Sequence, residues 1–512
     1  MNGAESLVRT LLACGVDTCF ANPGTSEMHF VAALDHVPGM RCVLGMFEGV
    51  VTGAADGYAR MAERPAATLL HCGPGLGNGF ANLHNARRAR VPMVNIVGDQ
   101  ATYHRPLDAA LTADTEALAR ACSVWTRTSD KAAAVGNDAA VAVQAARTAP
   151  GGIASLILPS DVCWDEGGIV GTPLAVPATP QVSPDMVEGA ARALRSGEQA
   201  LLLLAGPALR AKPLELAYGI AAKTGARVLA VSHNTRIEGG RGRHPVDRMP
   251  YPIDQAVGRL KDVKHIILVG STQPVAFFAY PNKPGYLRDP NSLVHVLARP
   301  ENDLPDALAR LADELGVKPL AAGDGGKQPE AQRGRPTPEG MAQTIAALLP
   351  ENAIVTDESV SFGRAFFPMT RNAAPHDWLQ ITGGAIGSGL PMAVGAAVAA
   401  PGRRVVSLQA DGSAMYTVQA LWTQAREKLD VTTVILANRK YAILIGELAS
   451  VGANPGPTAM GMMDLGNPDL DWVQIAGGMG IEAAKATTME SFADLFAAAN
   501  KRKGPFVIEL AI

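Results

Sequence analysis

The sequence predicts an α/β protein built from three doubly wound parallel-sheet domains. Apolar runs that do not alternate with polar residues, such as 65–73 and 91–99, suit strands covered on both faces. A helical segment, 79–90, separates these two runs and gives the βαβ pattern of parallel sheets. Two stretches rich in proline and glycine, 165–184 and 317–338, interrupt the alternation and indicate linkers between domains.

The linkers predict domains at 1–165, 183–317 and 338–512, because a chain of 512 residues is too long for one core. Ser183 and Pro184 form a typical helix start after the first linker. Each later domain repeats the apolar runs, at 199–206, 226–232 and 264–270 in the second and at 352–357, 403–411, 430–438 and 504–511 in the third.

Composition excludes several classes of protein. The net charge is −3, from 45 basic and 48 acidic residues, and no basic block suggests a nucleic-acid partner. The longest apolar run, 390–400, is too short to span a membrane, and the N-terminus lacks a secretory leader, so we expect a cytoplasmic protein. The six scattered cysteines have no C-x-x-C spacing and are typical of reduced core thiols.

Glu48 is the first candidate for chemistry, because it lies where a short apolar strand, 42–47, becomes a helix. A carboxylate there needs a partner. The glycines at 49, 53 and 57 recur every four residues on one helix face, which predicts close approach by another part of the protein. An ordinary acidic residue in the first helical turn is the alternative interpretation.

Asp411 and Asn438 are predicted to end two parallel strands, 27 residues apart. Ligands bind at the carboxyl ends of such strands, and the Gly412-Ser413 turn opens a helix whose amides can receive phosphate. Magnesium prefers oxygen ligands of this kind together with phosphate oxygens. The sequence therefore predicts a magnesium and phosphate site here.

Three further features are weaker when taken alone. A glycine cluster at 383–389 permits close backbone approach to a ligand at Gly384, with Ile386 its only bulky side chain. Thr25 follows an N-P-G turn, and His71 ends an apolar run before a glycine-rich turn. Imidazoles suit general acid–base work, but a histidine at a strand end is often structural.

Taken together, the motifs resemble those of the thiamine-diphosphate-dependent 2-oxo-acid decarboxylase and acetohydroxyacid synthase family, and most of all the benzoylformate decarboxylases. The matching stretches run along the whole chain: NPGTSE, FEGVVTGAADGYAR, LLHCGPGLGNG, AALTADTE, TGGAIGSGLP and DGSAMYTVQALWTQA. The resemblance implies an N-terminal pyrimidine-binding domain, a central Rossmann-like domain and a C-terminal diphosphate-binding domain.

In this family Glu48 matches the glutamate that hydrogen-bonds the cofactor's aminopyrimidine ring. Ile386 matches the apolar wedge that bends the cofactor. Thr25 and His71 match a serine and a histidine that contact the substrate carboxylate and relay protons.

The resemblance also implies a site for magnesium and diphosphate. Asp411, Asn438 and the carbonyl of Lys440 match the metal ligands, and Gly412 and Ser413 match diphosphate contacts. The implied cofactors are thiamine diphosphate and magnesium; nothing in the sequence supports FAD, which synthases often bind.

The chain departs from the family pattern at several positions. Ala410 precedes the first metal ligand, and Ala437 and Arg439 flank the second, where the family usually has G-D-G and N-N-G. A second active-site histidine is replaced in the central domain, where Phe277 or Phe278 falls instead.

The implied activity is decarboxylation of a 2-oxo acid to an aldehyde and carbon dioxide. The alternatives are a carboligase of the acetolactate synthase type and a non-catalytic cofactor-binding paralogue. Glu48 and Asp411 lie in different domains, and because the family's cofactor bridges two chains, the resemblance implies a homodimer or homotetramer with active sites between chains. Residues 446–472 form either a mobile lid or a surface loop.

Overall fold

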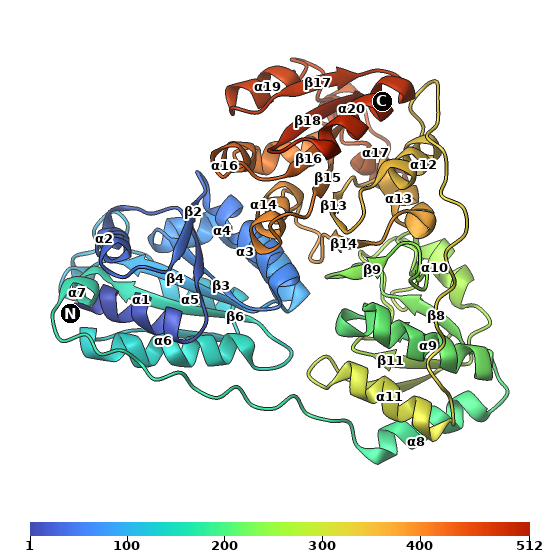
Figure 1. Cartoon of the computed structure of the whole chain (residues 1–512), viewed down its shortest axis with the longest axis horizontal. Helices are drawn as coiled ribbons and strands as arrows, with labels where there is room; N and C mark the ends of the chain where they lie inside the picture. Colours follow the sequence, from blue (N-terminus) through green and yellow to red (C-terminus); the bar gives the residue numbers. More distant parts are fainter.

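A computed structural model describes residues 1–512 and contains three α/β units (Figure 1). The first unit is a six-stranded parallel sheet in the order β2-β1-β3-β4-β6-β5. Its strands are β1 (Thr18–Ala21), β2 (Arg41–Leu44), β3 (Ala66–Leu70), β4 (Met93–Asp99), β5 (Trp125–Thr128) and β6 (Ile153–Pro159). Its helices are α1 (Gly3–Ala13), α2 (Met28–His36), α3 (Glu48–Ala62), α4 (Cys72–Ala89), α5 (Thr115–Cys122), α6 (Ala132–Arg147) and α7 (Ser160–Trp164).

The second unit is a five-stranded parallel sheet in the order β10-β8-β7-β11-β12. Its strands are β7 (Ala200–Leu204), β8 (Arg227–Ala230), β10 (Asp247–Arg248), β11 (His265–Val269) and β12 (Leu293–Ala298). Its helices are α8 (Pro184–Arg195), α9 (Ala211–Thr224), α10 (Ile253–Leu260) and α11 (Leu304–Glu314). Helix α8 has Ser183 as its N-cap residue and Pro184 in its first turn, as the sequence predicts.

The third unit is a seven-stranded sheet in the order β17-β18-β16-β15-β13-β14-β9. Its strands are β9 (Ile237–Gly239), β13 (Ala353–Glu358), β14 (His376–Gln380), β15 (Val405–Ala410), β16 (Val431–Ala437), β17 (Ala483–Ala486) and β18 (Phe506–Ala511). Its helices are α12 (Pro338–Leu348), α13 (Phe366–Met369), α14 (Gly389–Ala399), α15 (Asp411–Ala414), α16 (Ala420–Arg426), α17 (Ala442–Ser450), α18 (Pro457–Gly461), α19 (Trp472–Gly478) and α20 (Met489–Lys501).

Strand β9 is a feature that the sequence analysis did not anticipate. It belongs to the central part of the chain, yet it pairs antiparallel with β14 at the edge of the third sheet. The other pairs in that sheet are parallel, so the predicted fold class is confirmed with one antiparallel addition. The predicted boundaries at 1–165, 183–317 and 338–512 stay a prediction, because β9 carries the central segment into the third sheet.

Helices α3 and α14 join the first unit to the third through small residues. A side chain at Gly53 would lie 2.7 Å from Cβ of Pro391, and one at Gly57 would overlap the backbone of Met392. Gly53 and Gly57 thus meet another helix, as the spacing predicts, whereas Gly49 lies against the ring of Phe47. Figure 1 shows the two helices side by side at the centre of the molecule, and their apolar residues share one core.

Two linkers connect the units, as expected. The segment between α7 and α8 runs without helix or strand along one edge of the molecule, and the segment between α11 and α12 does the same along another (Figure 1). None of the helices combines the length and apolar character that crossing a membrane requires. All six cysteines are unpaired, and Cys19, Cys72, Cys122 and Cys163 are buried.

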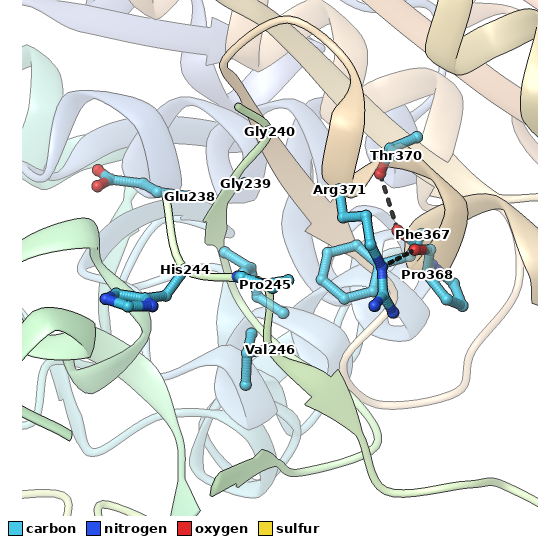
Figure 2. A pocket seen from close by; sticks show the side chains of 11 residues that line it. Glu238, Gly239, Gly240, His244, Pro245, Val246, Phe367, Pro368, Thr370 and Arg371 are labelled. Atoms are coloured by element: carbon cyan, nitrogen blue, oxygen red, sulfur yellow. Dashed lines mark hydrogen bonds between the residues drawn. The ribbon is translucent and has the colours of Figure 1, made fainter. Parts of the chain in front are cut away.

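A small cavity lies where the second and third units meet, between the β9 region and α13 (Figure 2). Its volume of about 20 Å³ has room for a single water molecule. None of the predicted site residues lines it, so it is part of the packing between the units.

Candidate functional site

Glu48 is the first residue of α3, and its carboxylate is buried against α4. Asn78 donates a hydrogen bond from Nδ2 to Glu48 Oε2 at 3.1 Å. The other oxygen, Oε1, lies against Gly75, where an added Cβ would be 2.8 Å away. Glu48 therefore keeps one carboxylate oxygen without a hydrogen-bond partner in the chain, available to a ligand.

His71 follows β3 and precedes α4, and Glu27 holds its ring. Nδ1 of His71 lies 3.0 Å from Oε2 of Glu27, and the Glu27 side chain is only 2% exposed. The same Glu27 oxygen accepts the backbone N–H of Gly24 at 2.7 Å. Gly24 has no side chain, and any Cβ there would overlap the His71 ring. The N-P-G turn thus leaves room for the imidazole and fixes the carboxylate that orients it.

Two residues beside His71 complete this cluster. The Ser26 hydroxyl donates to Glu27 and lies 3.3 Å from His71 Nδ1. Cys72 Sγ lies 3.2 Å from Ser26 Oγ and 3.8 Å from His71 Nδ1. Burial raises the pKa of the Cys72 thiol to about 11, so the thiol is protonated near neutral pH.

Thr25 lies outside this set of hydrogen bonds. It begins the short 3₁₀ helix Thr25–Glu27, and it is exposed without a side-chain hydrogen bond. Within the chain, the hydroxyl that approaches His71 belongs to its neighbour Ser26.

Asp411 and Asn438 lie at the carboxyl ends of the neighbouring parallel strands β15 and β16, as predicted. Asp411 Oδ2 accepts the backbone N–H of Arg439 at 2.7 Å, and Oδ1 accepts that of Gly412 at 2.8 Å. Burial raises the pKa of the Asp411 carboxyl, while these backbone donors lower it. Asn438 Oδ1 accepts the N–H of Lys440 at 3.0 Å. Two oxygen-bearing side chains are thus fixed by backbone groups at one sheet edge.

The turn that follows β16 packs against a later segment of the chain. Arg439 has a left-handed backbone with φ of 58°. Its carbonyl accepts the N–H of Leu465 at 2.8 Å, and its side chain pairs with Asp469 at 2.9 Å. The side chains of Tyr441 and Leu465 lie against Gly412, which must be glycine to admit them. Part of the segment 446–472 therefore covers the predicted diphosphate contact.

The glycine cluster before α14 is held by Glu358, a residue that the sequence analysis did not select. Its carboxylate accepts backbone N–H groups of Gly387 and Gly389 at 2.7 Å each, and of Ser388 at 3.3 Å. Burial raises the pKa of Glu358 to about 7. Since this turn directly follows Ile386, Glu358 fixes the backbone that carries that side chain.

Side chains from two other units reach the same cluster. Asn82 of α4 donates to the carbonyls of Gly49 at 2.8 Å and Gly387 at 3.1 Å. Asn85 donates to the carbonyl of Ala385 at 2.7 Å. From the central unit, the Phe277 ring lies 2.5 Å from where a Cβ on Gly384 would be. Of the two phenylalanines that the sequence singles out, Phe277 therefore packs against the glycine cluster.

Comparisons with known proteins show the family to which the chain belongs. The thiamine pyrophosphate enzyme N-terminal TPP binding domain matches residues 1–119, and the C-terminal TPP binding domain matches residues 361–510. The chain is 52% identical to a Mycobacterium tuberculosis protein named "Putative acetolactate synthase large subunit IlvX", over 100% of this chain and 99% of that protein. It is 30% identical to benzoylformate decarboxylase of Pseudomonas aeruginosa, over 97% of this chain and 96% of that enzyme.

A solved structure shows the same architecture over the full length. The thiamine diphosphate-dependent 4-hydroxybenzoylformate decarboxylase of Rhodococcus jostii superposes with a TM-score of 0.84 at 25% identity, covering 99% of this chain and 98% of that one. Both cofactor-binding domains, the relatives and the fold thus lead to one conclusion: the chain is an enzyme of the thiamine pyrophosphate family.

Proposed function

We propose that this enzyme decarboxylates a 2-oxo acid to an aldehyde and carbon dioxide with thiamine diphosphate and magnesium. The observation that carries the proposal is the Glu27–His71 pair, a buried carboxylate holding a half-buried imidazole by Nδ1 at 3.0 Å. Such a pair suits proton transfer, which is the step that turns a decarboxylated substrate into a released aldehyde.

The residues present fit the cofactor. Glu48 has a carboxylate oxygen without a hydrogen-bond partner that would serve the aminopyrimidine ring, and Ile386 would supply an apolar side chain for the cofactor. Asp411, Asn438 and the Lys440 carbonyl would hold magnesium. When bound, thiamine diphosphate supplies a carbon nucleophile for the substrate carbonyl and accepts the electron pair that carbon dioxide leaves behind.

The diphosphate would lie at the start of α15. Gly412 and Ser413 begin that helix, and their backbone groups follow directly after the metal ligand Asp411. Gly384, with φ of 82° and no side chain, lets the backbone of the glycine cluster approach the cofactor.

The remaining residues act on the substrate. Thr25 would hold the substrate carboxylate, and His71 would deliver a proton to the carbon that has lost carbon dioxide. Glu27 keeps the His71 ring in one orientation through Nδ1, which leaves Nε2 for transfer.

A second candidate is a carboligase that joins the decarboxylated fragment to another carbonyl compound. The 52% identity to a protein named as an acetolactate synthase favours it, as does Phe277, whose ring cannot relay a proton where the resemblance implies a second histidine.

Product analysis distinguishes the two candidates. The holoenzyme is incubated with a panel of 2-oxo acids, with and without aldehyde acceptors, and carbon dioxide and organic products are measured. Free aldehyde as the main product supports the decarboxylase, whereas a 2-hydroxy ketone or acetohydroxy acid supports the carboligase. Absence of thiamine-dependent carbon dioxide release from every acid contradicts both.

We further propose that two chains form each active site. Glu48 begins α3 of the first unit and Asp411 begins α15 of the third, and the family resemblance implies a cofactor held between two chains, one supplying each residue. Sedimentation of the holoenzyme as a dimer or tetramer is expected. A fully active monomer would contradict this.

A further inference from the structure

The cluster around His71 contains three side chains of the kinds that bind transition metals. Glu27, His71 and Cys72 each offer one ligand atom, and these atoms all lie within 4.8 Å of one another. The sequence analysis treated Cys72 as a core thiol, and the proposed reaction does not use it. Its sulfur nevertheless lies beside the proton-transfer pair.

From this geometry we infer a regulatory zinc site formed by Glu27, His71 and Cys72. In a tetrahedral zinc site, ligand atoms are about 3.2 to 3.6 Å apart, given zinc bonds of about 2.0 to 2.3 Å. His71 Nδ1 lies 3.0 Å from Glu27 Oε2 and 3.8 Å from Cys72 Sγ. The third pair, Glu27 and Cys72, lies within the 4.8 Å that bounds the whole set, so the three atoms are close to zinc-binding distances.

The chemistry of the ligands favours zinc over magnesium. Thiolate and imidazole are preferred by zinc, whereas magnesium requires oxygen ligands in octahedral geometry. On binding, the ion takes the place of the Cys72 thiol proton, which is released to solvent. One carboxylate and one thiolate then balance the two charges of the ion, with His71 neutral.

The surroundings are built to hold such a ligand set. The Gly24 N–H donates to Glu27 at 2.7 Å and fixes the carboxylate, a common support for metal ligands. Ser26 Oγ lies 3.2 Å from Cys72 Sγ and 3.3 Å from His71 Nδ1, where it can hydrogen-bond the ligand atoms, and water would take the fourth position on zinc. The His71 side chain is 22% exposed, which gives the ion an entry path, while Glu27 and Cys72 are buried.

The consequence for activity rests on the proposed function. With zinc on Nδ1, His71 is separated from Glu27 as a proton partner and can no longer take up a second proton to deliver. Zinc is therefore expected to inhibit carbon dioxide release reversibly, with activity restored by a chelator.

Cobalt(II), a spectroscopic substitute for zinc, tests the site without relying on turnover. The holoenzyme, saturated with magnesium and thiamine diphosphate, is titrated with Co²⁺. One equivalent per chain should produce a thiolate-to-cobalt absorption band, and Zn²⁺ should displace it. Absence of the band overturns the proposal.

Two variants assign the band to Cys72. Cys72→Ser should abolish it and weaken zinc binding at least about tenfold. The matched control is Cys122→Ser, another buried thiol, which already donates to a backbone carbonyl; it should keep the band. A band retained in Cys72→Ser would overturn the proposal. Glu27→Gln leaves all six thiols in place and should also weaken zinc binding.

The activity measurement is separate. Zinc should inhibit the unmodified enzyme and Cys122→Ser and have at least about tenfold less effect on Cys72→Ser. Equal inhibition of all three overturns the regulatory role. If no 2-oxo acid releases carbon dioxide, the proposed function fails, while the cobalt band still decides whether the metal site exists.

Discussion

The first and third units hold their polar site groups in opposite ways. In the first unit most contacts join side chain to side chain, since Glu27 pairs with His71 and Asn78 donates to Glu48, and Gly24 adds one backbone N–H to Glu27. In the third unit the carboxylates of Asp411 and Glu358 accept hydrogen bonds from backbone N–H groups of the turns. The comparison teaches that the proposed proton-transfer pair is held mainly by contacts between side chains, whereas the predicted metal and diphosphate site is held by main chain.

The largest expected effect comes from removing the ionisable oxygen of Glu48. Glu48→Gln should lower thiamine-dependent turnover at least about 100-fold, because the amide cannot exchange a proton with the cofactor ring. The amide oxygen can still accept from Asn78, so folding stability should change little. Steady-state kinetics and thermal melting measure the two effects.

Glu63→Gln is the matched control for that experiment. Glu63 caps the other end of α3, is exposed and pairs with Arg210. Its loss should leave turnover unchanged. Unchanged turnover in Glu48→Gln would show that Glu48 has no part in the mechanism. The contrast between the first and third units would then have no functional meaning at Glu48.

The second-largest expected effect tests the predicted metal site of the third unit, whose side chains are held by backbone groups. Asp411→Asn should raise the magnesium concentration for half-maximal activity at least about tenfold, since a carboxylate ligand is lost. Asp430→Asn, which changes a carboxylate beside the opposite end of β16, should keep the magnesium dependence of the unmodified enzyme. Equal magnesium dependence in both variants would contradict the metal assignment.

Glu358→Gln should affect stability more than chemistry. Gln places an N–H₂ group toward backbone N–H donors, which costs about 1 to 3 kcal/mol in the free energy of unfolding. Denaturant unfolding measures it. Glu351→Gln, at an exposed carboxylate just before β13, should cost less than about 0.5 kcal/mol.

The pH dependence of the free energy of unfolding gives a sharper test of Glu358. Because burial raises the pKa of Glu358 from 4.5 to about 7, the folded chain binds this proton more tightly than the unfolded chain does. The contribution of Glu358 to the free energy of unfolding therefore falls as pH rises from about 4.5 to about 7, by at most about 3 kcal/mol. Glu358→Gln should lack this fall, and an identical pH profile in both proteins would show that the carboxyl does not titrate there.

The smallest expected effect concerns the part of segment 446–472 that covers the predicted diphosphate contact. Asp469→Asn removes only an exposed ion pair with Arg439, so stability should change by less than about 1 kcal/mol. Arg439→Gly removes the same pair and also relieves a left-handed backbone at a non-glycine residue. Both variants should be cut faster by protease within residues 457–469. Unchanged proteolysis would show that the Arg439–Asp469 ion pair does not hold this segment in place.

Sequence patterns predicted the strand ends and missed the groups that orient them. Asp411 and Asn438 were accessible to prediction because each follows an apolar run at a parallel strand end. Glu48 was accessible because a charge between a strand and a helix is conspicuous. The predicted roles of Thr25, His71, Ile386, Gly384, Gly412, Ser413 and Lys440 depended on resemblance, and they stay predictions.

The missed residues act across long distances along the chain. Glu27 meets His71 over 44 residues, and Asn85 meets Ala385 over 300. No spacing rule links such pairs, because tertiary packing alone brings them together. Strand β9 escaped for a similar reason, since three residues inside the central segment carry too little pattern to reveal pairing with another sheet. A carboxylate in the NPGTSE stretch was the one visible signal for Glu27.

The glycine contact between α3 and α14 constrains how this enzyme can be recombined with its relatives. Backbone meets backbone at Gly57 and at Gly395, so a single methyl group on either surface would force the helices apart. A chimaera that exchanges only the first 165 residues must import a helix with glycines in the same register, or it will separate the two cofactor-binding units. Grafting α3 and α14 as a matched pair is the route that keeps such hybrids folded.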